Sequence, residues 1–150
     1  MKGDSVLVDR SLILRKLAEL EEYLEQVGEF KSVTYEDYCN NWKTQRIVER
    51  TLQMMIELCV DICNHIIADR KLRTPTSYAD SFRVLWESGL FPEPLLEVMD
   101  KMAKFRNLVV HHYDKVDGAI VVMILRKHLD DFIAFKDTIL WILKEQTNRE

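Results

Sequence analysis

The chain has 150 residues, of which 47% are hydrophobic and 31% charged, a balance that excludes a disordered or fibrous protein. Its net charge of −4 argues against a protein that coats nucleic acid through a broad basic surface, although a small focal RNA site is compatible with it. No secretory signal is visible, and the longest apolar run, Ala119–Leu125, is too short to span a bilayer. We expect a single domain over residues 1–150, located in the cytoplasm and without membrane contact.

The N-terminal part of the chain predicts a long amphipathic helix followed by a short helical segment. Asp9 is the expected N-cap of the long helix, and Gly28 its expected end. Apolar residues recur along it at helical spacing, and its acidic residues fall on the other, solvent-facing side. Thr34 with Asp37 three positions later resembles a capping box and predicts the start of the short segment.

A longer helix is predicted from Trp42 to about Lys71, a stretch without glycine or proline. Its apolar residues cover most of the circumference, which indicates a buried helix. They are Ile47, Met54, Met55, Ile56, Leu58, Cys59, Val60, Ile62, Cys63, Ile66 and Ile67. With three cysteines and no secretion signal, a disulfide framework is not expected, so we interpret Cys59 and Cys63 as buried thiols rather than a metal pair.

One narrow polar stripe runs along this helix. It consists of Arg46, Glu49, Arg50, Gln53, Glu57, Asp61, Asn64 and His65. Because unpaired charges are costly to bury, the stripe either pairs within the helix, for example Glu49 with Gln53, or lines a polar site. The sequence leaves both interpretations open.

The second half of the chain predicts three further helices. A short helix through Phe82–Trp86 should end at Gly89, and a longer one should begin at Pro92. After a break at Asp117–Gly118, a last helix should run from about Ala119 to Lys144 with a tail that frays over Thr147–Glu150. Its expected core face is Val122, Leu125, Leu129, Phe132, Ile133, Ile139, Leu140 and Ile142. The predicted fold is all-α, a mostly antiparallel four-helix bundle with an additional short helix.

The segment Lys104–Asp117, KFRNLVVHHYDKVD, concentrates the reactive side chains of the chain. Arg106, His111 and Tyr113 follow the pattern R-x4-H-x-Y. An imidazole can move protons and a guanidinium can stabilise phosphate charge, so the pair suits cleavage of an RNA phosphodiester by its own 2′-hydroxyl without a metal. DNA lacks that hydroxyl and should be inert.

Other residues are candidates for supporting roles in this chemistry. Asn107 can orient the phosphate, and Glu57 or Asp61 can hold Arg106 in place. On a regular helix, however, His111 lies about 140° from Arg106 at about 100° per residue, whereas Tyr113 shares the Arg106 face. Either the helix unwinds near Val110, or a second copy of the chain completes the site.

The R-x4-H-x-Y motif resembles that of the HEPN superfamily, and within it the chain is most similar to the HepT-like toxins. Further matches are the polar run from Arg46 to Ile66 and the Met102–Asn107 approach to the motif, so that the resemblance covers about Asp9 to Leu143. It implies a homodimeric, metal-independent ribonuclease without cofactor, with transfer RNA among the expected targets.

The resemblance also implies roles for single residues. Arg106 and His111 would be the catalytic pair, supported by Asn107, Arg50, Glu57 and Asp61. Tyr113 would be the residue that a cognate antitoxin, a minimal nucleotidyltransferase, modifies with AMP.

Two alternatives stay open on the sequence. The chain could be a non-catalytic helical subunit that binds a nucleotidyltransferase, since fold does not fix function. It could also be a metal enzyme, because Glu57, Asp61 and His65 share one helical face, although the Glu-x-x-His spacing typical of helical-bundle metal sites is absent.

Overall fold

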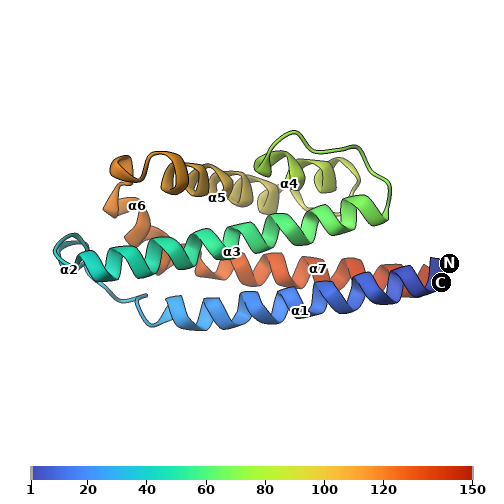
Figure 1. Cartoon of the computed structure of the whole chain (residues 1–150), viewed down its shortest axis with the longest axis horizontal. Coiled ribbons are helices and arrows are strands. Elements are labelled where there is room, and N and C mark those ends of the chain that lie inside the picture. Colours follow the sequence, from blue (N-terminus) through green and yellow to red (C-terminus); the bar gives the residue numbers. More distant parts are fainter. Residues whose placement is uncertain (1, 150) are drawn as a thin grey trace.

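The computed structural model describes residues 2–149, with side chains from residue 10 to residue 147, and this part of the chain contains helices and no strand (Figure 1). The α-helices are α1 (Lys2–Gly28), α2 (Tyr35–Cys39), α3 (Trp42–Asp69), α4 (Tyr78–Glu87), α5 (Glu93–His111), α6 (Gly118–Met123) and α7 (Leu129–Arg149). A 3-10 turn, η1 (Tyr113–Lys115), follows α5, and a π-helical stretch, η2 (Ile124–His128), joins α6 to α7.

Four long helical stretches form the bundle. Successive long helices α1, α3, α5 and α7 alternate in direction, and both termini lie at the same end of the molecule (Figure 1). The short helix α4 packs on α3 and α5, and α2 packs on α3 and α6 at the opposite end from the termini. The prediction of an all-α, antiparallel bundle is confirmed.

Helix boundaries agree with the capping signals except at the two ends of the chain. Thr34 caps α2, its hydroxyl accepting a hydrogen bond from the Asp37 amide at 3.1 Å. The prediction that Asp9 begins the first helix is wrong, because α1 already begins at Lys2 and no proline interrupts it; the Asp9 side chain lies outside the described residues. The tail is helical through Arg149, and Glu150 lies outside the described residues.

Helix α3 is the central element of the core. Most of its apolar side chains are buried, but Ile47 is 51% exposed and does not belong to the core. Cys59 and Cys63 are buried free thiols, as expected, and burial raises the pKa of both. By length and composition α3 could also cross a membrane, but 56% of its most apolar stretch is buried inside the bundle, as befits a central core helix.

The last helix, which follows the π-helical stretch, buries a narrower face than the sequence predicted. In α7 the core positions are Phe132, Phe135, Ile139, Ile142 and Leu143. The prediction that Ile133 and Leu140 belong to the core is wrong, since these side chains are 44% and 37% exposed.

Three phenylalanines join α7 to α4 and to the loop that follows α4. The ring of Phe135 meets Phe82 edge-on at 6.3 Å between centroids and Phe91 at 5.9 Å. All three rings are buried. Such a cluster stabilises the folded protein through the burial of apolar surface and through favourable edge-to-face contacts between the rings.

We expect Phe135→Ala to lower the free energy of unfolding by about 3–5 kcal/mol, because it removes a ring that no neighbour can replace. Trp141→Ala is the matched control: this aromatic residue on the same helix is 47% exposed and should cost about 0.5 kcal/mol or less. Urea unfolding followed by circular dichroism measures both. Equal losses in the two variants would contradict the assignment of Phe135 to the core.

Candidate functional site

Arg106 lies where α5, α3 and α4 meet. Its Nη2 donates to the Glu57 carboxylate on α3 at 3.3 Å, and its Nη1 donates to the Asn107 side-chain oxygen at 3.3 Å. Its guanidinium carbon stands 4.3 Å from the centre of the Tyr78 ring, at the start of α4. Only 15% of the side chain is exposed, and within the described residues its buried Nε has no hydrogen-bond acceptor. This cation is therefore held by one carboxylate, one amide and one aromatic face.

Glu57 is itself oriented by its own helix. Gln53, one turn earlier on α3, donates to the Glu57 carboxylate at 3.2 Å. That bond leaves the second carboxylate oxygen facing Arg106, with the Glu57 side chain 30% exposed. The expectation that Glu57 holds Arg106 is confirmed as a contact, while Asp61 pairs with Lys16 of α1 at 2.5 Å instead.

The rest of the polar stripe on α3 is satisfied mainly by other elements. Glu49 accepts a hydrogen bond from the Tyr38 hydroxyl of α2 at 3.2 Å, and burial raises the Glu49 pKa. Asn64 accepts one from Ser81 of α4 at 2.7 Å. The suggested pairing of Glu49 with Gln53 is therefore wrong, because both side chains have other partners. Arg50 is exposed and stands apart from the Arg106 contacts.

The histidine and tyrosine of the motif lie at the far end of α5. The helix stays regular through His111, so unwinding near Val110, one of the two alternatives that the sequence left open, does not occur. At His112 the backbone leaves the helix, with φ −142° and ψ 49°, and Tyr113 opens the 3-10 turn with its side chain 69% exposed. Tyr113 therefore does not continue the Arg106 face of α5, as a regular helix would require.

Arg106 and His111 do not meet within one chain. Because the intervening helix is regular, their side chains leave it about 140° apart. His111 is exposed, and within the described residues it makes no hydrogen bond or ion pair. Of the two routes that the sequence left open for bringing these groups together, local unwinding of α5 is therefore absent from the described residues.

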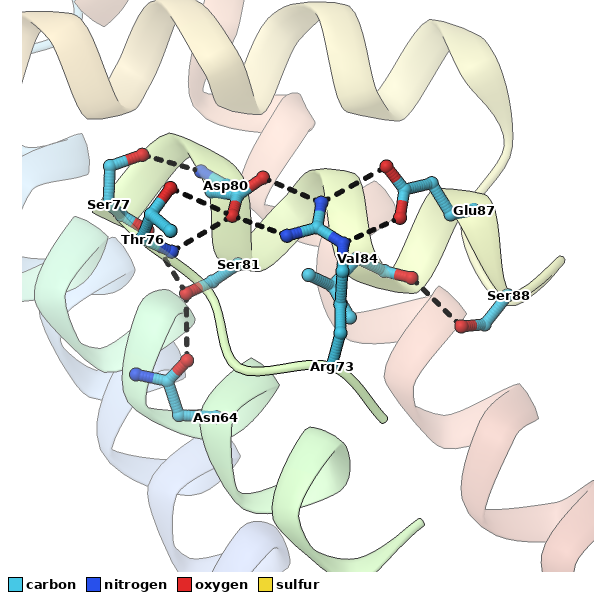
Figure 2. Close-up of polar contacts among 9 residues, drawn as sticks. All are labelled: Asn64, Arg73, Thr76, Ser77, Asp80, Ser81, Val84, Glu87 and Ser88. Carbon is cyan, nitrogen blue, oxygen red and sulfur yellow. Dashed lines mark hydrogen bonds and ion pairs between the residues drawn. The ribbon is translucent and has the colours of Figure 1, made fainter. Parts of the chain in front are cut away.

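The start of α4, which carries Tyr78, is fastened by a network around Arg73 (Figure 2). Arg73 reaches from the loop before α4 to two carboxylates of that helix, with nitrogen–oxygen distances of 2.8 Å to Asp80 and 2.8 Å to Glu87. Hydrogen bonds from Arg73, and from the Thr76 amide at 2.9 Å, hold the pKa of Asp80 well below its usual range. The Arg73 hydrogen bond also lowers the pKa of Glu87. The loop is thus tied to the helix it precedes.

The carboxylates that could bind a metal already face cations. Glu57 contacts Arg106, and Asp61 contacts Lys16, with His65 at 3.8 Å from the Asp61 carboxylate. Over the residues with described side chains, no three His, Cys, Asp or Glu residues are grouped to hold a metal ion. The geometry of these groups gives the metal-enzyme alternative no support.

Sequence reasoning missed Tyr78 and Lys16 as neighbours of the site, whereas Gln53 was already part of the polar stripe. Tyr78 directly follows the Ser77 cap of α4, a signal that locates the helix start but says nothing about the ring's neighbours. Lys16 lies on the apolar stripe of α1, where a lysine among leucines hints at an acidic partner on a neighbouring helix.

Comparison with known proteins supplies the family. The model of the ribonuclease HepT-like family matches residues 20–139. The chain belongs to the HepT-like ribonuclease family. The resemblance found on the R-x4-H-x-Y motif is thereby confirmed.

Two relatives of this HepT-like chain are named as RNA nucleases. It is 33% identical over 131 residues to the mRNA nuclease HepT of Shewanella oneidensis, covering 85% of this chain and 96% of that protein. It is 27% identical over 127 residues to the tRNA nuclease HepT of Aphanizomenon flos-aquae, covering 83% and 85%.

Solved structures of toxin–antitoxin complexes share the fold. A toxin–antitoxin crystal structure with AMP-PNP matches with a TM-score of 0.82 and 30% identity, covering 87% of this chain and 98% of that one. The tri-AMPylated Shewanella oneidensis HEPN toxin in complex with its MNT antitoxin matches with a TM-score of 0.79 and 32% identity, covering 86% and 96%.

The ion pairs of Arg73 make the free energy of unfolding depend on pH in the acidic range. Because the Asp80 and Glu87 carboxyls have folded-state pKa values below their unfolded values, their contribution is present above about pH 4–5 and is lost as the pH falls below it. We expect Arg73→Gln to lower the melting temperature at pH 7 and to flatten its decline between about pH 5 and pH 2. Arg15→Gln, at an exposed arginine on α1, is the control and should keep the wild-type profile. Parallel profiles for wild type and Arg73→Gln would contradict this assignment.

Proposed function

We propose that the chain is an endoribonuclease toxin that cleaves RNA without a metal ion. The observation that carries the proposal is the match of residues 20–139 to a family with RNA nucleases among its named members. The same chain holds Arg106 against Glu57 and exposes His111 at the end of the same helix. The target is an RNA, with messenger and transfer RNA both represented among the relatives. The reaction needs no cofactor and takes place in the cytoplasm.

The proposed reaction uses the 2′-hydroxyl of the substrate as the nucleophile. The His111 imidazole takes the proton from that hydroxyl, and the resulting oxygen attacks the adjacent phosphorus. The bond to the 5′-oxygen breaks, and an imidazolium returns a proton to the leaving oxygen. The products are a 2′,3′-cyclic phosphate and a 5′-hydroxyl.

Arg106 supplies the positive charge for this step. Its contacts to Glu57 and Asn107 use one hydrogen of each terminal nitrogen, which leaves further N–H groups for phosphoryl oxygens. A guanidinium fixed before the substrate arrives stabilises the charge that develops in the transition state without reorganisation. Asn107 is exposed beside it and is placed to donate to the same phosphate.

A homodimer follows from the separation of these two groups. Since Arg106 and His111 leave a regular helix in different directions, a phosphate reaches both only where one copy supplies the guanidinium and the other the imidazole. Asp61 and Arg50, on the exposed side of α3, would then support the shared groove rather than contact Arg106.

Tyr113 is the proposed target of a partner nucleotidyltransferase antitoxin. Its side chain is 69% exposed next to the His111 end of α5, and a HEPN toxin similar to this chain is AMPylated and bound to an MNT antitoxin. In the proposed step the Tyr113 oxygen attacks the α-phosphorus of ATP and releases pyrophosphate. The attached AMP adds bulk and negative charge where an RNA phosphate must bind, so it blocks cleavage.

The test of the nuclease is cleavage of RNA by purified, unmodified protein in excess chelator. Wild type should cut RNA and leave 2′,3′-cyclic phosphate ends, and it should not cut DNA of the same sequence. His111→Ala and Arg106→Ala should each reduce the rate at least about a hundredfold. His112→Ala, at the neighbouring exposed histidine with no assigned role, should cut like wild type. Absence of cleavage by folded, unmodified, dimeric protein would instead favour the non-catalytic binding subunit.

The test of the modification is mass spectrometry after coexpression with the cognate antitoxin. Wild type and Tyr35→Phe should gain AMP, whereas Tyr113→Phe should not; Tyr35, 54% exposed, is the matched control. Modified wild type should also lose its RNA cleavage. AMP on Tyr113→Phe at the wild-type level would refute the assignment.

A further inference from the structure

We propose that Tyr78 is a positioning residue for Arg106, and that it acts through the face of its ring. The inference rests on the proposed role of Arg106 in stabilising phosphate charge. In this proposal, the loop before Tyr78 and helix α4, which begins at Tyr78, hold the ring in a fixed position.

The polar contacts of Arg106 leave its orientation under-determined. Both of its hydrogen bonds, to Glu57 and to Asn107, are long at 3.3 Å, and Asn107 is its exposed neighbour in sequence. Its Nε has no acceptor within the described residues. A planar cation held in this way can still tilt about the Glu57 contact, so a further contact is needed to fix its plane.

The Tyr78 ring supplies that contact. The Arg106 guanidinium carbon lies 4.3 Å from the ring centre, within the distance at which an aromatic face attracts a cation. The attraction is stronger where water is excluded, and the Arg106 side chain is only 15% exposed. Within the described residues the Tyr78 hydroxyl makes no hydrogen bond, so the ring face, not the hydroxyl, is the part in contact.

Tyr78 can fix Arg106 only because its own backbone is fixed. Ser77, the N-cap of α4, accepts a hydrogen bond from the Asp80 amide at 3.0 Å, and Ser81 donates to Asn64 of α3 at 2.7 Å (Figure 2). Arg73 holds Asp80 from the loop side with two bonds of 2.8 Å. The backbone around Tyr78 is thus held by the Ser77 cap, by the hydrogen bond of Ser81 to α3 and by the bidentate ion pair of Asp80 with Arg73.

A positioning role predicts which kinetic constant changes. The ring orients a charge that matters most when the phosphoryl group gains negative charge, so its loss should lower kcat more than it raises KM. Tyr78→Phe keeps the ring face and should retain activity within about twofold of wild type. Tyr78→Leu should lower kcat about tenfold, the size expected of a partly desolvated cation–π contact.

The discriminating experiment replaces Tyr78 with phenylalanine and then with fluorinated phenylalanines, in the full-length protein. Fluorine withdraws electron density from the ring face while its shape changes little, so kcat should fall stepwise with the number of fluorines. Merely structural packing would leave kcat unchanged along that series and would overturn the proposal. Equal losses in Tyr78→Phe and Tyr78→Leu would also overturn it, since they would point to the hydroxyl.

Tyr23→Leu is the matched control. Tyr23 lies on α1 beside the same surface depression as Tyr78 and Glu57, but its hydroxyl donates to Glu19, and among the described residues no cation lies over the face of its ring. It should cleave RNA like wild type.

A second measurement does not depend on cleavage. Melting temperatures of Tyr78→Leu, Arg106→Met and the double variant should be non-additive, because each single change removes the same contact. Additive shifts would overturn the contact itself. If wild type fails to cut RNA, the proposed function fails, but the comparison of melting temperatures still tests the contact between Tyr78 and Arg106. If wild type cuts RNA and Tyr78→Leu cuts it equally well, only the positioning role of Tyr78 fails.

Discussion

The largely buried cation of Arg106 is the constraint on which the arrangement of the neighbouring helices depends. A charge with 15% of its side chain exposed requires a counter-charge, and Glu57 of α3 provides it from across the helix interface. The aromatic face of Tyr78 covers the guanidinium from α4. Three helices that are distant in sequence therefore share one polar centre, and the polar stripe on an otherwise buried α3 exists to meet such partners.

In the proposed function, the two ends of the motif on α5 have different surroundings and serve two purposes. Its middle is anchored in the bundle through Arg106, whereas its end carries His111 and then Tyr113 into solvent. In the proposed reaction an anchored guanidinium would provide the fixed charge that electrostatic catalysis requires, and the exposed tyrosine would be accessible to the proposed modification. The acidic net charge is compatible with this arrangement, since the cationic group is local and presented at one place rather than spread over a surface.

Neighbouring elements contribute stiffness rather than chemistry. The Arg73 network closes the loop before α4 onto that helix, and the buried rings of Phe82 and Phe135 fasten the same helix to α7. Because α4 is short, these attachments at its start and on its inner face decide where Tyr78 stands. Substitutions in this region should therefore alter the orientation of Arg106, although they lie outside the R-x4-H-x-Y motif.

The sequence by itself determined the class of fold, the buried character of α3, the cap at Thr34 and the motif, because periodicity, capping and spacing are local properties. It could not determine how wide the buried face of α7 is, since Ile133 directly follows the buried Phe132, is as apolar as a core residue and yet is 44% exposed. Nor could it choose between Glu57 and Asp61 as partner of Arg106, because one helical turn separates them on the same stripe. Only the packing of α1 and α5 against α3 decided that choice, by bringing Lys16 to one carboxylate and Arg106 to the other.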